Sequence, residues 1–524
     1  MEYIFTIDLG TSGPKVALVS TEGEVVCCVK EPTRVNLLPN GGAEQSPDDW
    51  WRAITAAADK VWQESPVSPS DVSAVACSAQ WSGTVAVDQK GNPLHDAIIW
   101  MDSRGAPYIQ QITDGLIKVE GYALSKIVTW IRKTGGAPGK SGKDPIAHIL
   151  FLKNEKPDVY SQTFRFLEAK DYLNLKLTGQ FSASFDSITL HWVTDSRDID
   201  NIHYDDQLME MAGIEPAKLP ELRASTDILD ELLPGPAEEL GVPAGLPVVM
   251  GTPDIQAAAI GSGAVMDFEP HLYVGTSSWI TCHVPYKKTD LFHNMASIPS
   301  GIPGKYFIAN EQETAGACLD FLIRNVMNHA LPQDDSIPDS LYTELNSAAT
   351  AIPAGSDGLL FLPWLYGERT PVEDHTIRGG FTNLSLSHGK GHLVRSVMEG
   401  VALNARWLLK YVEKFARKRM DNIHFIGGGA NSAVWCQIMA DVLGRTILQV
   451  KDPLYANARG TAALAAVALG ETSFEQFGAN IQIAQTFHPN GENATLYEDR
   501  FDVFLKVYKQ NKKIHAHLNR QQTE

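Results

Sequence analysis

The chain lacks any uninterrupted apolar stretch as long as a membrane-spanning helix requires, about 18 residues. Its first residues, Met1 to Ile4, lead directly into a strand-like run. The basic segment, apolar core and cleavage site of a secretory signal are all missing there. These absences predict a cytoplasmic protein without a membrane partner.

Cysteine and positive charge are also scarce. The six cysteines include no Cys-x-x-Cys pair, and the adjacent Cys27 and Cys28 should point to opposite faces of a predicted strand. This usage indicates reduced thiols rather than a disulfide framework or a zinc site. Lys and Arg total 44 against 62 Asp and Glu, a formal net charge of −18, which disfavours nucleic acid as a partner.

Two similar hairpins are predicted, one near the start of the chain and one past its middle. In the first, the β-rich runs 3–8 and 15–19 flank a turn; in the second, the runs 271–274 and 279–284 do so. A repeated unit indicates a duplicated domain, and 524 residues exceed what one core normally organises. We therefore predict an N-terminal domain at 1–262 and a C-terminal domain at 263–524.

Small and hydroxylated residues form both turns. Their backbone N–H groups can approach phosphate oxygens closely, and the lysine beside the first turn adds a positive charge. The predicted phosphate-binding residues are Gly10, Thr11, Ser12 and Lys15 in the first hairpin and Gly275, Thr276 and Ser277 in the second. Asp8, which ends the first strand, could hold Mg²⁺ through water, or it could simply cap the turn.

A helix start follows the buried-strand run 247–250. Thr252 suits the N-cap and Pro253 the first helical position, which places Asp254 in the first turn. This position lies at the carboxyl end of a strand, where α/β sheets build their sites. The alternative is that Asp254 only compensates the helix dipole.

Two glycine-rich segments lead to different predictions, a ligand-binding turn for one and a surface loop for the other. The strand-like run 423–426 enters a Gly-Gly-Gly turn before a helix, which lets a flat ligand approach the backbone, although it could be only a tight connection. The predicted ligand contacts there are Gly428, Gly429, Ala430 and Asn431. Residues 135–141 resemble a P-loop, but their spacing is one residue short and a helix-like end precedes them, so we predict a surface loop.

Taken in order, these segments resemble the FGGY family of carbohydrate kinases within the actin-like ATPase superfamily, and most closely its xylulokinase-like members. The resemblance rests on residues 8–15, 100–104, 170–173 with 177–179, 251–254, 275–277, 379–384 with 392–400, and 427–431. Two positions depart from the family signatures: Asn383 stands where Gly is usual, and His148 where Lys is expected.

The resemblance implies an α/β fold of two actin-like (ribonuclease H-like) ATPase domains around a central cleft. It implies ATP and Mg²⁺ as cofactors, with residues 428–431 against the adenosine, and a small sugar or polyol as the substrate. Asp254 would be the catalytic base that accepts the proton of the attacking hydroxyl. The expected assembly of the chain is a homodimer.

The resemblance also locates the sugar-binding segment. Its predicted members are Gln80, Trp81, Ser82, Asp102 and Arg104, together with Asp254. Where xylulokinase-like members carry Met and His, this chain has Trp81 and Ser82. A ketopentose such as xylulose is the expected substrate, with a related polyol as another. Two alternatives are a sugar-sensing pseudokinase and a non-catalytic actin-like protein.

Overall fold

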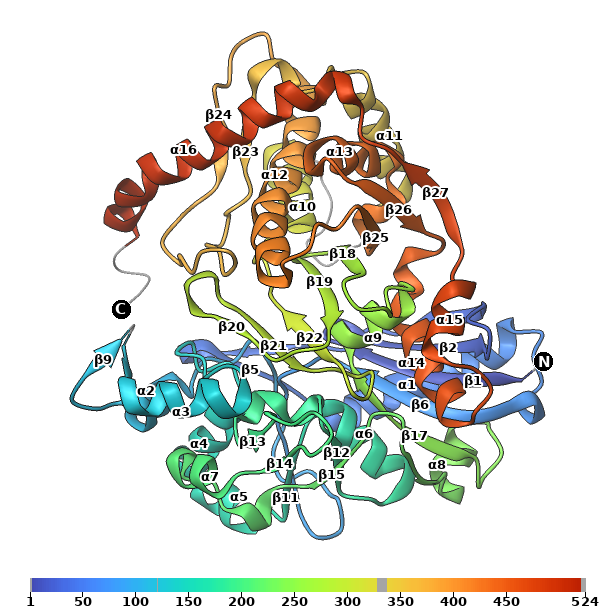
Figure 1. The fold of residues 1–524 in the computed structure, drawn as a ribbon. Coiled ribbons are helices and arrows are strands. Elements are labelled where there is room, and N and C mark those ends of the chain that lie inside the picture. Colours follow the sequence, from blue (N-terminus) through green and yellow to red (C-terminus); the bar gives the residue numbers. More distant parts are fainter. Residues whose placement is uncertain (1, 120, 328–336, 520–524) are drawn as a thin grey trace.

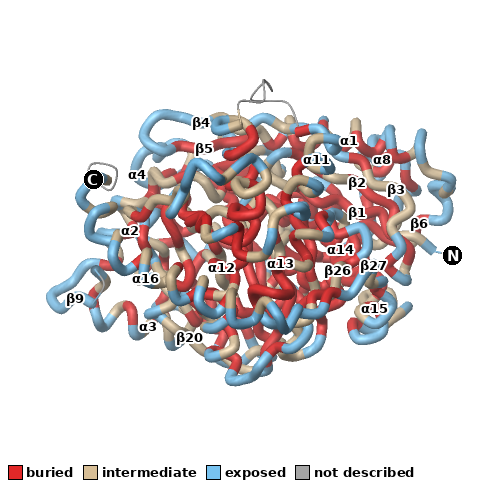
Figure 2. The backbone as a smooth tube through the Cα atoms, turned by 90° about the horizontal axis from the view of Figure 1, so that it is seen from above, coloured by how far each residue is buried: buried red, intermediate tan, exposed pale blue. Residues whose placement is uncertain are grey.

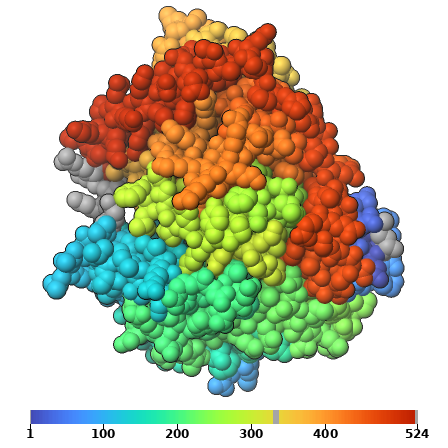
Figure 3. Space-filling model, viewed as in Figure 1, coloured from blue at the N-terminus to red at the C-terminus, as the bar shows by residue number. Residues whose placement is uncertain are grey.

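The computed structural model describes residues 2–119, 121–327 and 337–519. The chain forms two lobes, each built on a mixed β-sheet with helices against it (Figure 1). The N-terminal half makes the lower lobe in that view and most of the C-terminal half makes the upper one. Figure 3 shows the segment coloured yellow-green, just past the middle of the chain, lying between them.

The N-terminal sheet has six strands in the order β16-β17-β6-β1-β2-β3. They are β1 (Tyr3–Gly10), β2 (Gly13–Ser20), β3 (Val25–Lys30), β6 (Val72–Ala79), β16 (Ile228–Glu231) and β17 (Pro247–Pro253). The central strand β1 pairs antiparallel with β2 and parallel with β6. Its six inner residues are all buried, and four of them are apolar, as expected for a strand inside a sheet.

The C-terminal sheet repeats this order of strands. Its eight strands run β20-β21-β22-β19-β18-β25-β26-β27, and from β22 to β27 each neighbouring pair has the same direction as its counterpart from β3 to β16. The strands are β18 (Pro270–Val274), β19 (Ser278–Val284), β20 (Thr289–Asp290), β21 (Met295–Pro299), β22 (Tyr306–Ala309), β25 (Asn422–Ile426), β26 (Thr446–Val450) and β27 (Ile483–Phe487). The duplication predicted from the two hairpins is therefore present in the fold.

The predicted hairpins form, with strands longer than expected. In the first, pairing continues to Gly10 opposite Gly13, so only Thr11 and Ser12 make the turn. In the second, β18 and β19 flank the three-residue turn 275–277. The strands extend because their ends still find ladder partners on the neighbouring strands.

One local prediction is wrong. The helix after β17 does not begin with Thr252 as N-cap and Pro253 as its first residue, because both residues still pair with β6. Helix α9 (Asp254–Gly261) instead begins at Asp254 itself. Asp254 thus remains in the first turn, directly at the end of a parallel strand.

The helices pack around the two sheets. The longer ones are α1 (Pro47–Glu64), α3 (Leu124–Thr134), α4 (Pro145–Glu155), α6 (Ala169–Thr178), α11 (Asp339–Thr350), α12 (Lys390–Ala416), α13 (Ala433–Leu443), α14 (Ala456–Ala468) and α16 (Ala494–Leu518). Figure 2 shows the buried backbone concentrated in the middle of the molecule, with exposed segments at its rim. Among the described helices, none is long and apolar enough to cross a membrane.

The segment that resembles a P-loop has no strand before it. Helix α3 ends at Thr134, and Gly135 takes a left-handed conformation that terminates the helix. The prediction of a loop rather than a strand–phosphate loop–helix unit is therefore confirmed.

Helix α14 crosses between the lobes. It belongs to the C-terminal half of the sequence, yet its alanines, among them Ala458 and Ala462, pack with residues of β1, β2, β6 and β17 in a common core. It also crosses α9 at very short range: a Cβ added to Gly460 would lie 1.8 Å from the Ala257 carbonyl oxygen, and one added to Gly261 would lie 1.8 Å from that of Ala456. Only glycine allows this approach at either position.

We expect Gly460→Ala to destabilise the protein although alanine is the better helix former. The added methyl group overlaps the backbone of α9, and overpacking of this kind usually costs about 1–3 kcal/mol. Urea denaturation followed by tryptophan fluorescence measures the effect. Gly235→Ala is the matched control, because no described atom lies within 4 Å of the Cβ it adds in α8 (Pro234–Leu240). Equal midpoints for both variants and the wild type would contradict the close crossing.

Candidate active site

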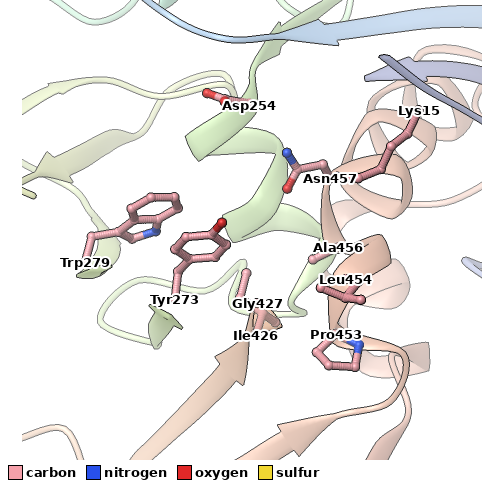
Figure 4. A pocket seen from close by; sticks show the side chains of 10 residues that line it. All are labelled: Lys15, Asp254, Tyr273, Trp279, Ile426, Gly427, Pro453, Leu454, Ala456 and Asn457. Atoms are coloured by element: carbon pink, nitrogen blue, oxygen red, sulfur yellow. The ribbon is translucent and has the colours of Figure 1, made fainter. Parts of the chain in front are cut away.

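A cavity of about 90 Å³ lies where the two lobes meet (Figure 4). Lys15 and Asp254 reach it from the N-terminal half, and Tyr273, Gly427 and Asn457 from the C-terminal half. Two of the predicted site residues, Lys15 and Asp254, therefore share one cavity with the residue that precedes the predicted adenosine segment. The cavity is the meeting point of both hairpins and of the glycine-rich turn.

Asp254 begins helix α9, and one carboxylate oxygen accepts a hydrogen bond of 2.8 Å from the Ile255 N–H. Burial, together with the negative charge of Asp8, raises the pKa of Asp254 to about 7, against the opposing effects of that hydrogen bond and of Lys15. A carboxyl group with this pKa can accept and release a proton near neutral pH. The helix-dipole interpretation does not account for this environment.

Asp8 is the centre of a hydrogen-bonded cluster at the end of β1. Its Oδ1 accepts bonds from the Ser78 hydroxyl at 2.9 Å and from Asn457 Nδ2 at 3.2 Å, and its Oδ2 lies 3.3 Å from Lys15 Nζ. Burial lowers the pKa of Lys15, but the adjacent Asp8 outweighs it and the net shift is upward. The ammonium therefore stays charged beside the cavity.

Asn457 was missed by the sequence reasoning. It reaches Asp8 from α14, so the contact joins the two halves of the chain over 449 residues. The available signal was the presence of one asparagine in an alanine-rich helix. Asparagine has a low helix propensity, so its presence there indicates a role other than stabilising the helix. No local motif could have identified its partner.

Thr11 connects the turn of the first hairpin to the predicted sugar segment. Its hydroxyl donates to Gln80 Oε1 at 2.8 Å and accepts a bond of 2.9 Å from the Trp100 indole. Gln80 in turn donates to Gln45 Oε1 at 2.7 Å, and Gln45 donates to the Thr11 carbonyl at 2.9 Å. Gln45, a buried residue that precedes α1, was also missed, because nothing in its local sequence marks it.

Trp81 and Ser82 are both anchored by hydrogen bonds within the protein. The Trp81 indole donates to the Ser187 carbonyl at 2.9 Å, and the half-buried ring stays partly accessible. The Ser82 hydroxyl donates to the Lys143 carbonyl at 2.7 Å, and its backbone is left-handed with φ of 65°. The indole is therefore held by its polar edge, which fixes the orientation of its apolar face.

The buried Asp102 pairs with Arg104, which is only partly buried. Asp102 accepts bonds from the backbone N–H groups of Ala43 and Arg104 and from Arg104 Nε, each between 2.8 and 2.9 Å. Arg104 also pairs with Glu44, and its guanidinium lies 4.3 Å from the centre of the Phe151 ring. The pair is thus well fixed, and its contact with a sugar stays a prediction.

The turn of the second hairpin and the glycine-rich turn lie side by side, because they follow the neighbouring strands β18 and β25. The Gly275 and Thr276 carbonyls accept bonds from the Gly316 and Ala315 N–H groups at 2.7 and 2.8 Å, which fixes the turn. At the glycine-rich turn, Gly428 has no described atom within 4 Å of the position that a Cβ would take. Its backbone is therefore open to a ligand.

Known proteins resemble this chain along nearly its whole length. Two models of the FGGY family of carbohydrate kinases match the chain, that of the N-terminal domain at residues 3–261 and that of the C-terminal domain at 272–469. The xylulose kinase of Bacillus subtilis is 28% identical, with 99% of each chain covered. The xylulose kinase of Staphylococcus epidermidis is 30% identical, covering 99% of this chain and 98% of that one.

Among solved structures, gluconate kinase from Lactobacillus acidophilus superposes with a TM-score of 0.84 at 22% identity, over 99% of each chain. This likeness confirms the predicted fold of two actin-like α/β domains. Together, the two family models cover most of the sequence, in the order of its two lobes. The chain belongs to the FGGY family of carbohydrate kinases.

Proposed function

We propose that this sugar kinase transfers the γ-phosphoryl group of ATP to a hydroxyl of a small neutral ketose or polyol, with Asp254 as the proton acceptor. The observation that carries the proposal is the position of Asp254: it begins α9 in the cavity between the lobes, with a pKa of about 7. Xylulose is the first candidate substrate, since two relatives that match along nearly their whole length are xylulose kinases.

The reaction requires one bond to form and one to break. The sugar hydroxyl oxygen attacks the γ-phosphorus, the bond from that phosphorus to the β–γ bridging oxygen breaks, and ADP leaves. The hydroxyl proton passes to the Asp254 carboxylate. Positioning of the two substrates and stabilisation of the phosphoryl charge supply most of the rate in such transfers.

The residues around the cavity suit a nucleotide and its metal ion. Lys15 supplies positive charge, and the open backbone at Gly428 suits the adenosine. Over the described residues, no three His, Cys, Asp or Glu side chains are grouped to hold a metal ion. Mg²⁺, however, usually binds through one or two carboxylates, water and substrate phosphates. A single carboxylate, that of Asp8, is therefore enough as the ligand that the protein supplies. When bound, the ion would neutralise phosphate charge.

The charges near Asp254 favour a neutral substrate. Asp8 and Glu311 both act on the Asp254 carboxyl to raise its pKa, against the effect of the single cation Lys15. An aldonate would bring a further carboxylate into the same region. The pseudokinase alternative is less consistent with the site, because Asp254, Asp8 and Lys15 are all in place.

Asp254→Asn should lower turnover by about 10²–10⁴-fold, the usual contribution of a positioned proton acceptor, while ATP and sugar bind almost normally. Steady-state assays coupled to ADP release, together with calorimetric titrations, separate turnover from binding. Asp158→Asn, a change at an exposed position of the N-terminal half, is the matched control. Turnover within threefold of the wild type would remove Asp254 from the chemistry.

The pH dependence follows from the raised pKa of Asp254. Only the ionised carboxylate can accept the proton, so kcat/KM for the sugar should rise with pH up to about 7 and level off above it. Glu311→Gln removes a negative charge that favours the protonated form, and we expect the midpoint of the rise to move to lower pH. Glu492→Gln, a substitution at an exposed position in the C-terminal half, serves as the control. An unmoved or higher midpoint for Glu311→Gln would contradict the assignment.

Trp81 should contribute to sugar selectivity through its apolar face, which suits the C–H surface of a sugar. We expect Trp81→Ala to raise KM for the preferred sugar at least tenfold, and Trp81→Phe to retain part of the affinity. The measurement is kcat/KM over ketopentoses, polyols and aldonates, beside the melting temperature. If Trp81→Ala lowers the melting temperature while the order of preference stays unchanged, Trp81 is a core residue and not a sugar contact.

A further inference from the structure

Tyr273 occupies an unusual place between the second phosphate turn and the glycine-rich turn. It lies in β18, two residues before Gly275. A Cβ added to Gly275 would lie 2.1 Å from the Tyr273 hydroxyl oxygen, and one added to Gly427 would lie 3.0 Å from the ring. The side chain therefore fills the space directly beside both glycines.

The aromatic ring is held rigidly. It stacks on Trp279 with a centroid distance of 3.9 Å and an angle of 10° between the ring planes. The Trp279 indole in turn donates a hydrogen bond of 2.9 Å to His271 Nε2. Two strands of the C-terminal sheet thus fix the Tyr273 ring, and with it the direction of its hydroxyl.

The hydroxyl of Tyr273 faces the cavity. Figure 4 shows the oxygen on the side of the ring toward Asp254 and Asn457. Among the residues that the structure describes, none forms a hydrogen bond with it, and the side chain is only half-buried. A rigid tyrosine normally directs its hydroxyl to a partner, so this one is available to a ligand.

The charges around the cavity keep the phenol in its donor form. Burial raises the pKa of Tyr273, and Asp254, Asp8 and Glu311 raise it further, against the effect of Lys15. The hydroxyl therefore carries its proton throughout the neutral range. Phosphate oxygens of a nucleotide only accept hydrogen bonds, so a protonated phenol is a complementary group that adds no charge.

We propose that the Tyr273 hydroxyl donates a hydrogen bond to a β- or γ-phosphate oxygen of the bound nucleotide, opposite Lys15. Tyr273 and Lys15 line the same cavity from different lobes. The two groups would hold the polyphosphate from both sides, one through a neutral donor and one through charge. This inference rests on the proposed use of the cavity by ATP and adds a phosphate-binding residue outside the predicted turns.

Tyr273→Phe tests the inference because it removes only the hydroxyl and keeps the stacked ring. We expect the affinity for ADP and for a non-hydrolysable ATP analogue to fall about ten- to hundredfold, the range for one hydrogen bond to a charged group. Adenosine affinity should stay within twofold, since adenosine has no phosphate. Isothermal calorimetry without sugar measures all three, independently of the role of Asp254.

Tyr342→Phe is the matched control: it removes a hydroxyl bound to Asp320 at 3.1 Å within the C-terminal half, away from the cavity. It should leave all three affinities unchanged. Unchanged ADP affinity in Tyr273→Phe would overturn the inference. Equal losses for adenosine and ADP would also overturn it, as they would reflect ring packing, and so would tighter ADP binding, which would show that the hydroxyl obstructs the site.

Discussion

The close crossing of α9 and α14 is the constraint on which the site depends. Gly261 and Gly460 allow the two helices to touch backbone to backbone, and this contact brings α14 onto the N-terminal sheet. As a result, α9 presents Asp254 at one end, and α14 carries Asn457 to the Asp8 carboxylate. Residues from both halves of the chain therefore meet at one cavity without a long loop to carry them.

Charge is distributed unevenly around that cavity. Lys15 is its positively charged lining residue, and Asp8 lies 3.3 Å from it. The same Asp8 raises the pKa of Asp254, whose carboxyl is already poorly solvated. The Asp8 carboxylate thus pairs with the Lys15 ammonium and raises the pKa of Asp254. The proposed phosphate-binding and proton-accepting residues are therefore linked electrostatically.

The sequence predicted the elements and the local motifs because their signals are local. Apolar β-rich runs around small turn residues identified both hairpins, and Asp254 was found from the strand before it, although the helix begins one residue later than expected. Asn457, Gln45 and Tyr273 could not be found in this way. Their roles depend on contacts with residues far away in sequence, and no spacing rule records which distant strand or helix lies beside them.

The central claim is that Asp254 receives the proton of the attacking sugar hydroxyl. A crystal structure of the Asp254→Asn protein with xylulose and a non-hydrolysable ATP analogue tests it most directly. The account predicts the side chain at position 254 within hydrogen-bond distance, about 2.6–3.2 Å, of the one sugar hydroxyl that faces the γ-phosphate. A sugar hydroxyl aligned with the γ-phosphate but contacting another carboxylate, such as Glu311, would contradict it.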